Sequence, residues 1–240
     1  MRQTGKGVVS SCWFLQGPSI LQIGLLYDES CYIRETCSAM TVLVTGNLGY
    51  IGSVLTPLLA QRGHQVRGFD SGLFRDCFLT PAVEPTEQIV KDIRDIELED
   101  LDGVTTVVHL AGLSNDPLGE IDDALTEAIN YKGSMRLGEL ARDAGVRRFV
   151  YASSQSMYGI SGTGVELEED TSEKNPLTSY ARTKWKAEQG LMVLRTPGFE
   201  VTALRPSTVY GASPRLRCDI VFNNFMACAF TTGSIEIKSD

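Results

Sequence analysis

Short apolar runs alternate with longer amphipathic stretches along the chain from residue 41 onward. Runs of this length predict buried strands, and the stretches between them predict helices. The predicted strands cover residues 41–45, 65–69, 88–90, 104–110, 148–152 and 201–205, and the predicted helices cover 50–62, 121–144 and 179–195. Strands that are apolar throughout and alternate with helices indicate a parallel sheet covered on both faces. The pattern therefore predicts an α/β fold with a doubly wound parallel sheet.

Residues 1–39 show no comparable period. The Gln-Gly-Pro sequence at 16–18 interrupts the one apolar stretch that resembles a signal-peptide core, whereas Arg2 and Lys6 leave a transit peptide as an alternative. Met40 directly precedes the first predicted strand. We therefore expect residues 1–39 to be an N-terminal extension outside the fold.

The composition is that of a globular protein with an acidic balance, with a formal net charge of −8. A broad nucleic-acid surface needs clustered lysine and arginine, so no nucleic-acid partner is expected. No run of about 18 apolar residues is present, so no membrane-spanning helix is predicted. The six cysteines form no CxxC pair, and His64 and the strand residue His109 have no thiols nearby, so no metal site is expected. Reduced thiols are typical of a cytoplasmic protein.

A glycine-rich loop follows the first predicted strand. Gly46, Gly49 and Gly52 form a GxxGxxG pattern, with Tyr50 and Ile51 before the last glycine and a helix directly after. The first glycine allows a tight turn, the second allows close approach of a pyrophosphate, and the third lets the helix pack on the strand. The helix N-terminus adds N–H donors and a partial positive charge. Together these features predict a Rossmann-type nucleotide-binding domain with these five residues against the cofactor.

Asp70 directly follows the second predicted strand. An acid in this place accepts hydrogen bonds from the adenosine ribose, and its charge repels a 2′-phosphate, so NAD is expected in preference to NADP. Arg75 is close enough in sequence to weaken that preference, and a solvated turn aspartate is the structural alternative.

Tyr180 and Lys184 form a YxxxK motif on the last predicted helix. The spacing of four places both side chains on one face, one turn apart. A phenol with a pKa of about 10 is a weak base at neutral pH, but a neighbouring ammonium favours the phenolate. The pair therefore predicts a general base with its supporting cation. Chance occurrence is the alternative, which the position after a nucleotide-binding motif disfavours.

With these motifs in place, residues 40–240 resemble the extended short-chain dehydrogenase/reductases of the NAD-dependent epimerase/dehydratase group. The other segments that carry the resemblance are Asp92-Ile93, Leu110-Ala111-Gly112-Leu113-Ser114, the NxxG motif from Asn130, and the loop from Ser153-Ser154 to Met157-Tyr158-Gly159. The resemblance implies that Ser154 is the catalytic hydroxyl beside Tyr180 and Lys184. It also implies that NAD is lined by Asp92, Ile93, Leu110, Ala111, Gly112, Asn130 and Ser207.

Two positions depart from members of this group. Its dehydratases carry an Asp-Glu pair directly after the catalytic hydroxyl, where this chain has Gln155 and Ser156. Neither side chain can shuttle a proton as a carboxylic acid does, so a 4,6-dehydratase is disfavoured. In addition, Thr208 stands where the group often has an asparagine that reaches the sugar nucleotide.

The resemblance divides the chain into an NAD-binding domain at 40–214 and the start of a truncated C-terminal substrate domain at 215–240, with 235–237 as that domain's first strand. Arg215 and Arg217 are placed to meet phosphate charge, although a solvated loop is equally consistent with the sequence. The positions implied for substrate contact are Ser114, Ser154, Tyr180, Thr208 and Asn224.

The expected function is NAD-dependent epimerisation of a nucleotide sugar, similar to that of UDP-glucose 4-epimerases, by transient hydride transfer. Tyr180 is the expected base, and Lys184 and Ser154 assist it. One alternative is a reductase or dehydrogenase of a nucleotide sugar, which would show net turnover of NADH. The other is an inactive NAD-binding module that lacks its substrate domain.

A homodimer is also expected, because members of this group pair through two long helices. An apolar helix face that remains exposed after folding is typical of a partner surface. Completion of the monomer core is the alternative. The apolar residues assigned to this surface are Ala128, Met135, Leu137, Trp185 and Leu191.

Overall fold

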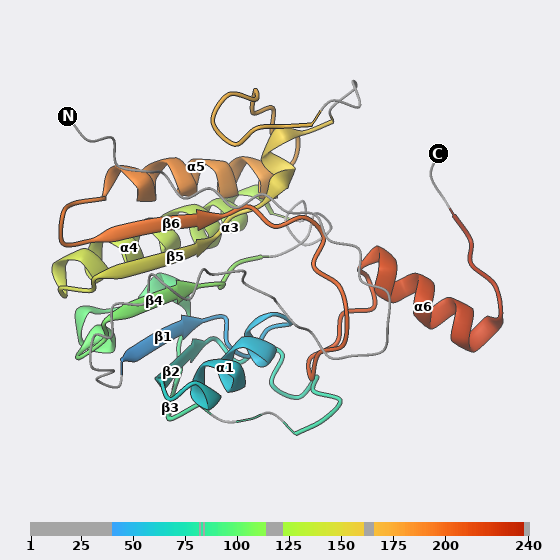
Figure 1. Ribbon diagram of the computed structural model, residues 1–240, viewed down its shortest axis with the longest axis horizontal. Helices are drawn as coiled ribbons and strands as arrows, with labels where there is room; N and C mark the ends of the chain where they lie inside the picture. The colour runs from blue at the N-terminus through green and yellow to red at the C-terminus, as the bar shows by residue number, and fades with distance from the viewer. Residues whose placement is uncertain (1–39, 82, 84, 114–121, 161–165, 238–240) are drawn as a thin grey trace, which may run out of the picture. The chain divides into compact units, whose positions relative to one another are not determined.

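The computed structural model describes residues 40–81, 83, 85–113, 122–160 and 166–237 (Figure 1). Every described residue belongs to one compact unit, Ser38–Asp240. The sheet, its helices and the candidate site therefore all lie within this unit.

Six parallel strands form one sheet in the order β3-β2-β1-β4-β5-β6. The strands are β1 (Thr41–Thr45), β2 (Gln65–Asp70), β3 (Glu87–Val90), β4 (Thr106–His109), β5 (Arg148–Ala152) and β6 (Glu200–Leu204). This confirms the predicted doubly wound sheet, because each predicted strand is present to within two residues at either end. The strand order changes direction between β1 and β4, the place where such sheets bind ligands at their carboxyl ends.

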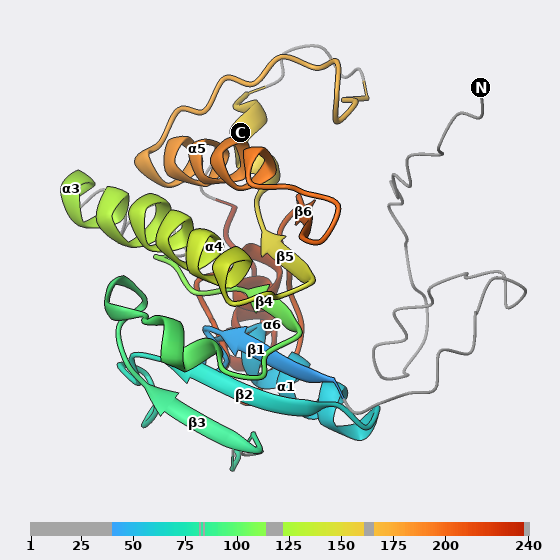
Figure 2. The ribbon, with the colours of Figure 1, turned by 90° about the vertical axis from the view of Figure 1, so that its left-hand side faces the viewer.

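Helices cover both faces of this sheet (Figure 2). Helix α1 (Gly52–Gln61) lies on one face, and α3, α4 and α5 lie on the other. The predicted helix at 121–144 consists of α3 (Asp123–Thr126), a π-helical segment η4 (Glu127–Gly133) and α4 (Ser134–Asp143), and α5 covers Ser179–Val193. Short 3-10 helices occur at η2 (Ile93–Asp95), η3 (Leu98–Leu101) and η5 (Gln155–Tyr158).

The main core lies between the sheet and helices α4 and α5, and it includes Leu137 and Leu191, both fully buried. The prediction that these two leucines belong to a dimer surface is therefore wrong. Gly138 faces Leu191, and Gly190 faces Met135, so closely that a Cβ on either glycine would overlap those side chains. Helices α4 and α5 thus pack on each other within one chain.

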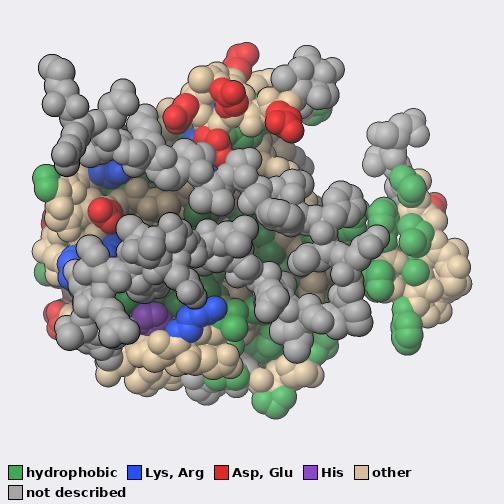
Figure 3. Space-filling model, in the orientation of Figure 1, with side chains coloured by type: hydrophobic (Ala, Val, Ile, Leu, Met, Phe, Trp, Pro, Cys, Tyr) green, Lys and Arg blue, Asp and Glu red, His purple; other side chains and the backbone are tan. Residues whose placement is uncertain are grey.

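Helix α6 (Val221–Thr232) has no buried residue (Figure 1). Most of its large apolar side chains are exposed, and hydrophobic side chains gather on this helix in Figure 3. Phe230 is 92% exposed. The prediction of a strand over 235–237 is wrong: within the described residues no strand lies beside this segment to pair with it. None of the described helices is long and apolar enough to cross a membrane.

Candidate functional site

The glycine-rich loop joins β1 to α1 at the carboxyl edge of the sheet. Gly46 has a positive φ of 72°, and a Cβ there would lie 2.8 Å from the backbone nitrogen of Ala111. A Cβ on Gly52 would overlap the carbonyl oxygen of Gly46, whereas a Cβ on Gly49 would approach nothing but that same oxygen, at 3.1 Å. The first and last glycines thus allow close backbone packing, and the middle one leaves an open approach to the loop.

The N-terminus of α1 fits a phosphate group. Within the described residues no side chain caps this helix, and its first turn contains no acidic residue. The backbone nitrogens of Ser53 and Val54 donate to the carbonyls of Gly49 and Ile51. No acidic side chain of this turn offsets the positive end of the helix dipole, which therefore favours an anion.

Asp70 ends β2 and faces this loop. Its carboxylate accepts hydrogen bonds from the backbone nitrogens of Gly72, at 2.8 Å, and Leu48, at 3.3 Å. Burial raises the pKa of Asp70, and these two donors and the charge of Arg215 oppose that effect. A carboxylate has about four acceptor sites, so acceptors remain for the hydroxyls of a ribose.

A pair of amide side chains holds the loop in place, and no motif singles them out. Asn47 donates to Gln88 at 2.7 Å, and Gln88 donates back to Asn47 at 3.3 Å. The pair crosses over Gly68 in β2, where any Cβ would overlap both side chains. A glycine inside a strand is the one sequence signal of this close approach.

The segment after β4 crosses the same edge of the sheet. Leu110 donates its backbone N–H to the Thr45 carbonyl at 3.1 Å, and Ala111 donates to the Thr45 hydroxyl at 3.3 Å. Asn130 accepts from the nitrogen of Leu113 at 2.8 Å and donates to its carbonyl at 3.1 Å. Asn130 is buried in the π-helical segment, so this departure from α-helical geometry holds the predicted cofactor-lining segment.

His109 is a structural residue of β4, as expected from its place in a buried strand. Its Nδ1 lies 2.6 Å from the Thr45 hydroxyl, and its Nε2 lies 2.8 Å from the Ser134 hydroxyl. Burial lowers the pKa of His109 to about 3, and the nearby charge of Lys184 contributes to that shift. The ring is therefore neutral at physiological pH.

Tyr180 and Lys184 occupy the first turns of α5, one turn apart. Lys184 is 6% exposed, and its Nζ donates to the carbonyl oxygen of Ala152 at 2.6 Å. The same Nζ lies 4.6 Å from the centre of the Tyr151 ring, and a Cβ on Gly112 would be 4.0 Å from it. Burial lowers the pKa of Lys184 to about 8, so the amine is mostly charged at neutral pH.

The two neighbouring serines have different surroundings. Ser153 is buried and donates to Glu188 at 2.5 Å. Ser154 is half-buried and accepts hydrogen bonds from the backbone nitrogen of Ser156 at 3.2 Å and from its hydroxyl at 2.8 Å. Ser153 is thus engaged in the protein interior, which leaves Ser154 as the more accessible of the two.

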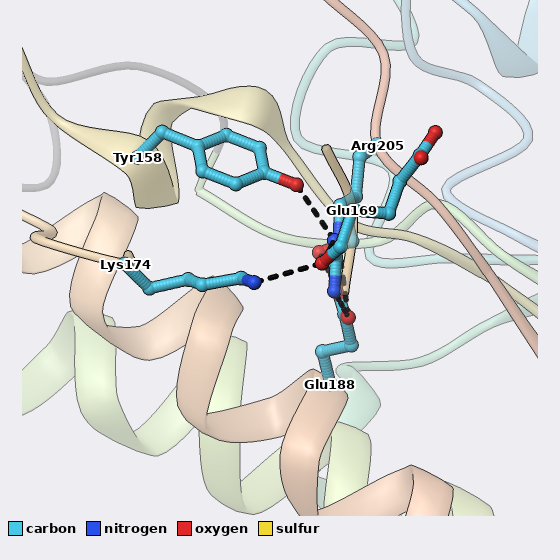
Figure 4. Close-up of polar contacts among 6 residues, drawn as sticks. Tyr158, Glu169, Lys174, Glu188 and Arg205 are labelled. Carbon is cyan, nitrogen blue, oxygen red and sulfur yellow. Dashed lines mark hydrogen bonds and ion pairs between the residues drawn. The ribbon is translucent and has the colours of Figure 1, made fainter. Parts of the chain in front are cut away.

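Arg205, directly after β6, is the centre of a polar cluster beside this serine loop (Figure 4). Its Nη2 lies 2.6 Å from Glu188, a carboxylate with a 5% exposed side chain. Its Nη1 donates to the Tyr158 hydroxyl at 2.7 Å and to the Glu169 carbonyl at 2.8 Å, and Lys174 donates to the same carbonyl at 2.7 Å. The cluster joins β6, α5, η5 and the loop before α5.

Asp92 and Ile93 follow β3 and were both expected to line NAD, but the side chain of Ile93 points into the core. Asp92 accepts from the backbone nitrogen of Arg94 at 2.9 Å and forms an ion pair with its guanidinium at 2.7 Å, which holds the pKa of Asp92 below its usual value. Ile93 is buried in the core, where a Cβ on Gly133 would lie 3.1 Å from it. Any contact of Ile93 with a cofactor must therefore come from its backbone.

The remaining predicted positions are less constrained. Ser207 and Thr208 are exposed residues after β6, and Asn224 is an exposed residue of α6. Ser114 lies outside the described residues. Tyr50 donates its hydroxyl to the carbonyl of Gly211 at 2.7 Å. No cluster of histidine, cysteine and acidic side chains suited to a metal ion occurs in the described part of the chain.

Residues 42–236 match the model of the NAD dependent epimerase/dehydratase family. The chain belongs to this family. NAD is the family's cofactor, and the open glycine-rich loop, the uncapped N-terminus of α1 and the placement of Asp70 fit it.

Curated relatives include enzymes named for steroid and for nucleotide-sugar substrates. The 3 beta-hydroxysteroid dehydrogenase/Delta 5-->4-isomerase of Mycobacterium tuberculosis is 35% identical over 181 residues, which cover 71% of this chain and 47% of that protein. The UDP-glucose 4-epimerase of Mycolicibacterium smegmatis is 33% identical over 182 residues, which cover 72% of this chain and 57% of the epimerase. The chain spans about half the length of the curated relatives it matches.

A solved structure of MoeE5 in complex with UDP-glucose and NAD has the same arrangement of elements. It superimposes with a TM-score of 0.69 at 32% identity, covering 83% of this chain and 64% of MoeE5. The likeness extends over the nucleotide-binding fold.

Proposed function

We propose that the protein is an NAD-dependent epimerase of a nucleotide sugar, with Tyr180, Lys184 and Ser154 as its catalytic residues. The observation that carries the proposal is the place of Lys184. This buried amine lies beside Gly112 and Ala152 at the carboxyl edge of the sheet, one helical turn from Tyr180. Burial of an ammonium costs free energy, and an ammonium one helical turn from a tyrosine favours a phenolate base.

Each residue has a separate part in the proposed reaction. The Tyr180 oxygen accepts the proton of a substrate hydroxyl, and the Lys184 ammonium stabilises the phenolate that accepts it. The Ser154 hydroxyl hydrogen-bonds the substrate oxygen and orients it toward Tyr180. NAD, when bound, would accept the hydride from the same carbon and return it to the opposite face of the keto sugar, and Tyr180 would return the proton to the sugar oxygen. Gln155 and Ser156 follow Ser154 and offer no carboxylic acid, which supports epimerisation over elimination of water.

The proposal is tested with the purified chain and a panel of UDP- and dTDP-sugars. We expect conversion between two sugar epimers with no net change in NADH absorbance. Epimerase activity is absent if chromatography of the reaction mixture finds no epimer. Steady formation of NADH would identify a dehydrogenase instead. Binding of NAD without turnover of any substrate would identify a cofactor-binding module.

A second candidate is a hydroxysteroid dehydrogenase, which the 35% identity to the mycobacterial 3 beta-hydroxysteroid enzyme favours. The same Tyr180 base serves both reactions, because both begin with removal of a proton from a secondary alcohol. The two are separated by adding a 3β-hydroxysteroid to the substrate panel. NADH formation with the steroid, together with no epimer formed from any nucleotide sugar, would decide for this candidate.

We further propose that the protein is a cytoplasmic homodimer. The described cysteines Cys77, Cys218 and Cys228 are free thiols, which supports a reducing location. Because Leu137 and Leu191 are buried in the monomer core, the dimer surface must involve other apolar residues.

A further inference from the structure

The segment after β6 lies on the glycine-rich loop. The Ser213 hydroxyl donates to the carbonyl of Tyr50 at 2.8 Å and lies 3.0 Å from the hydroxyl of Ser53. The carbonyl of Pro214 accepts a hydrogen bond from the backbone nitrogen of Leu79 at 2.8 Å. These contacts join residues 211–214 both to the start of α1 and to the chain that follows β2.

Arg215 comes next, and its side chain is directed toward the Asp70 region. Its guanidinium carbon lies 4.3 Å from the centre of the Phe74 ring. Its Nε is buried and has no hydrogen-bond partner within the described residues. Its charge is close enough to Asp70 to lower the pKa of that carboxyl, against the larger effect of burial. A buried N–H without a partner is costly, so this site suits a ligand that supplies an acceptor.

We propose that Arg215 binds the adenosine half of the dinucleotide, with its guanidinium directed at the ribose and adjacent phosphate oxygens. The inference rests on the proposed NAD-dependent function. Asp70 accepts from ribose hydroxyls, and Arg215 donates from the opposite chain segment, so the two have complementary roles. The sequence alone left this arginine between substrate phosphate and a solvated loop, whereas its contact with Phe74 and the hydrogen bond of Ser213 to Tyr50 just before it direct it to the cofactor.

The same placement affects the choice between NAD and NADP. Arg75, the neighbour of Asp70 in sequence, is exposed, whereas Arg215 is the arginine whose charge reaches Asp70. A guanidinium beside Asp70 offsets the repulsion of a 2′-phosphate. We therefore expect Arg215→Gln to weaken any NADP binding of the wild type as well as its binding of ADP-ribose.

The test compares the binding of ADP-ribose and UDP to wild type, Arg215→Gln and Arg217→Gln by calorimetry. Arg217 is the matched control, since it lies in the same segment and forms an ion pair with Asp219. We expect Arg215→Gln to weaken the affinity for ADP-ribose about tenfold or more, because a hydrogen bond from a charged group is lost. The affinity for UDP should be unchanged. Weakened UDP binding with unchanged ADP-ribose binding would assign Arg215 to the substrate and overturn the proposal.

Two further measurements separate the possible causes of a failure. Arg215→Lys keeps the charge and loses the planar donor group, so we expect intermediate affinity, and its melting temperature reports whether the fold is intact. If Arg215→Gln binds ADP-ribose and NADP as tightly as wild type, the role of Arg215 is refuted. If wild type itself does not bind NAD or ADP-ribose, the proposed function fails and not merely this residue's part in it.

Discussion

Tyr180 is the side chain on which the proposed proton transfer depends. Tyr180→Phe removes the phenolic oxygen and leaves the glycine-rich loop and Asp70 unchanged. We expect turnover to fall by about 10²–10⁴-fold, the usual contribution of a general base, with unchanged NAD affinity. Steady-state rates and NAD titration measure the two effects. Tyr131→Phe, in the π-helical segment η4, is the control and should keep its activity. Retention of more than about a tenth of wild-type turnover in Tyr180→Phe would exclude it as the base.

Lys184 makes the stability of the cofactor-free protein depend on pH. Burial lowers its pKa to about 8 from the ordinary 10.5, so the folded state opposes protonation of this amine. The burial of the charged amine lowers the free energy of unfolding below about pH 8. This loss disappears as the pH rises toward about 10.5, because above that pH the amine is neutral in both the folded and the unfolded chain. Relative to Lys184→Met, wild type should gain up to about 3 kcal/mol across that window.

Urea denaturation of both proteins at about pH 7 and about pH 10 measures this difference, since other titrating groups affect both alike. A free-energy difference between wild type and Lys184→Met that is the same at both pH values would show that the amine is not desolvated in the folded state.

Site residues can be predicted from the sequence where the residues that act together are close to one another along the chain. The interval between Tyr180 and Lys184 and the place of Asp70 after a strand are local patterns of this kind. The carboxylate of Glu188 and the guanidinium of Arg215 could not be predicted in this way. Their roles depend on residues far along the chain, such as Ser153 for the former and Phe74 for the latter, and no local pattern encodes those contacts.

At the scale of elements, one buried ion pair joins helix α5 to the end of strand β6. Glu188→Gln removes the charge that faces Arg205 and leaves a largely buried guanidinium without its carboxylate. We expect a loss of about 3–5 kcal/mol in the free energy of unfolding, because breaking one side of such a pair leaves an uncompensated charge. Chemical denaturation measures it.

The matched control lies on the same helix. Lys186 forms an ion pair with Glu127 at 2.5 Å, but these side chains are 52% and 33% exposed. Solvent screens that pair, so Lys186→Gln should cost less than about 1 kcal/mol. Equal losses in the two variants would show that the Arg205 cluster has no special part in stability.

The elements themselves were predictable to different degrees. The central strands β1 and β4 follow from apolar runs, because a strand covered on both faces needs apolar residues. The edge strand β3 has a weaker signal, since none of its residues is buried. The π-helical segment at Glu127–Gly133 has no such signal, since Asn130 bonds to a distant backbone and the helical period is nearly unchanged. Residues 235–237 have an apolar alternation typical of a strand, yet pattern alone does not supply the neighbouring strand that pairing requires.

At the scale of the whole molecule, the described fold contains the proposed cofactor and catalytic residues but little of what would choose a substrate. The glycine-rich loop, Asp70, Ser154 and the Tyr180–Lys184 pair all lie in the sheet and the helices and loops that border it. One curated relative is named for a steroid substrate and another for a nucleotide sugar, and the chain covers about half of each. The proposed proton transfer by Tyr180 would serve both kinds of substrate, so substrate choice would depend on groups beyond this set.

The exposed apolar face of α6 predicts how the 240-residue chain associates with itself. Met226 and Phe230 are 72% and 92% exposed, whereas the apolar residues of α4 and α5 mostly pack within the chain. An apolar face of this kind usually marks a contact surface, so we expect self-association through α6 that rises with protein concentration. Light scattering over a concentration series should give a lower mass for Phe230→Glu than for wild type. Met192→Glu, at an exposed position of α5, should change nothing; a lower mass for that variant alone would place the contact on the α4–α5 helix pair instead.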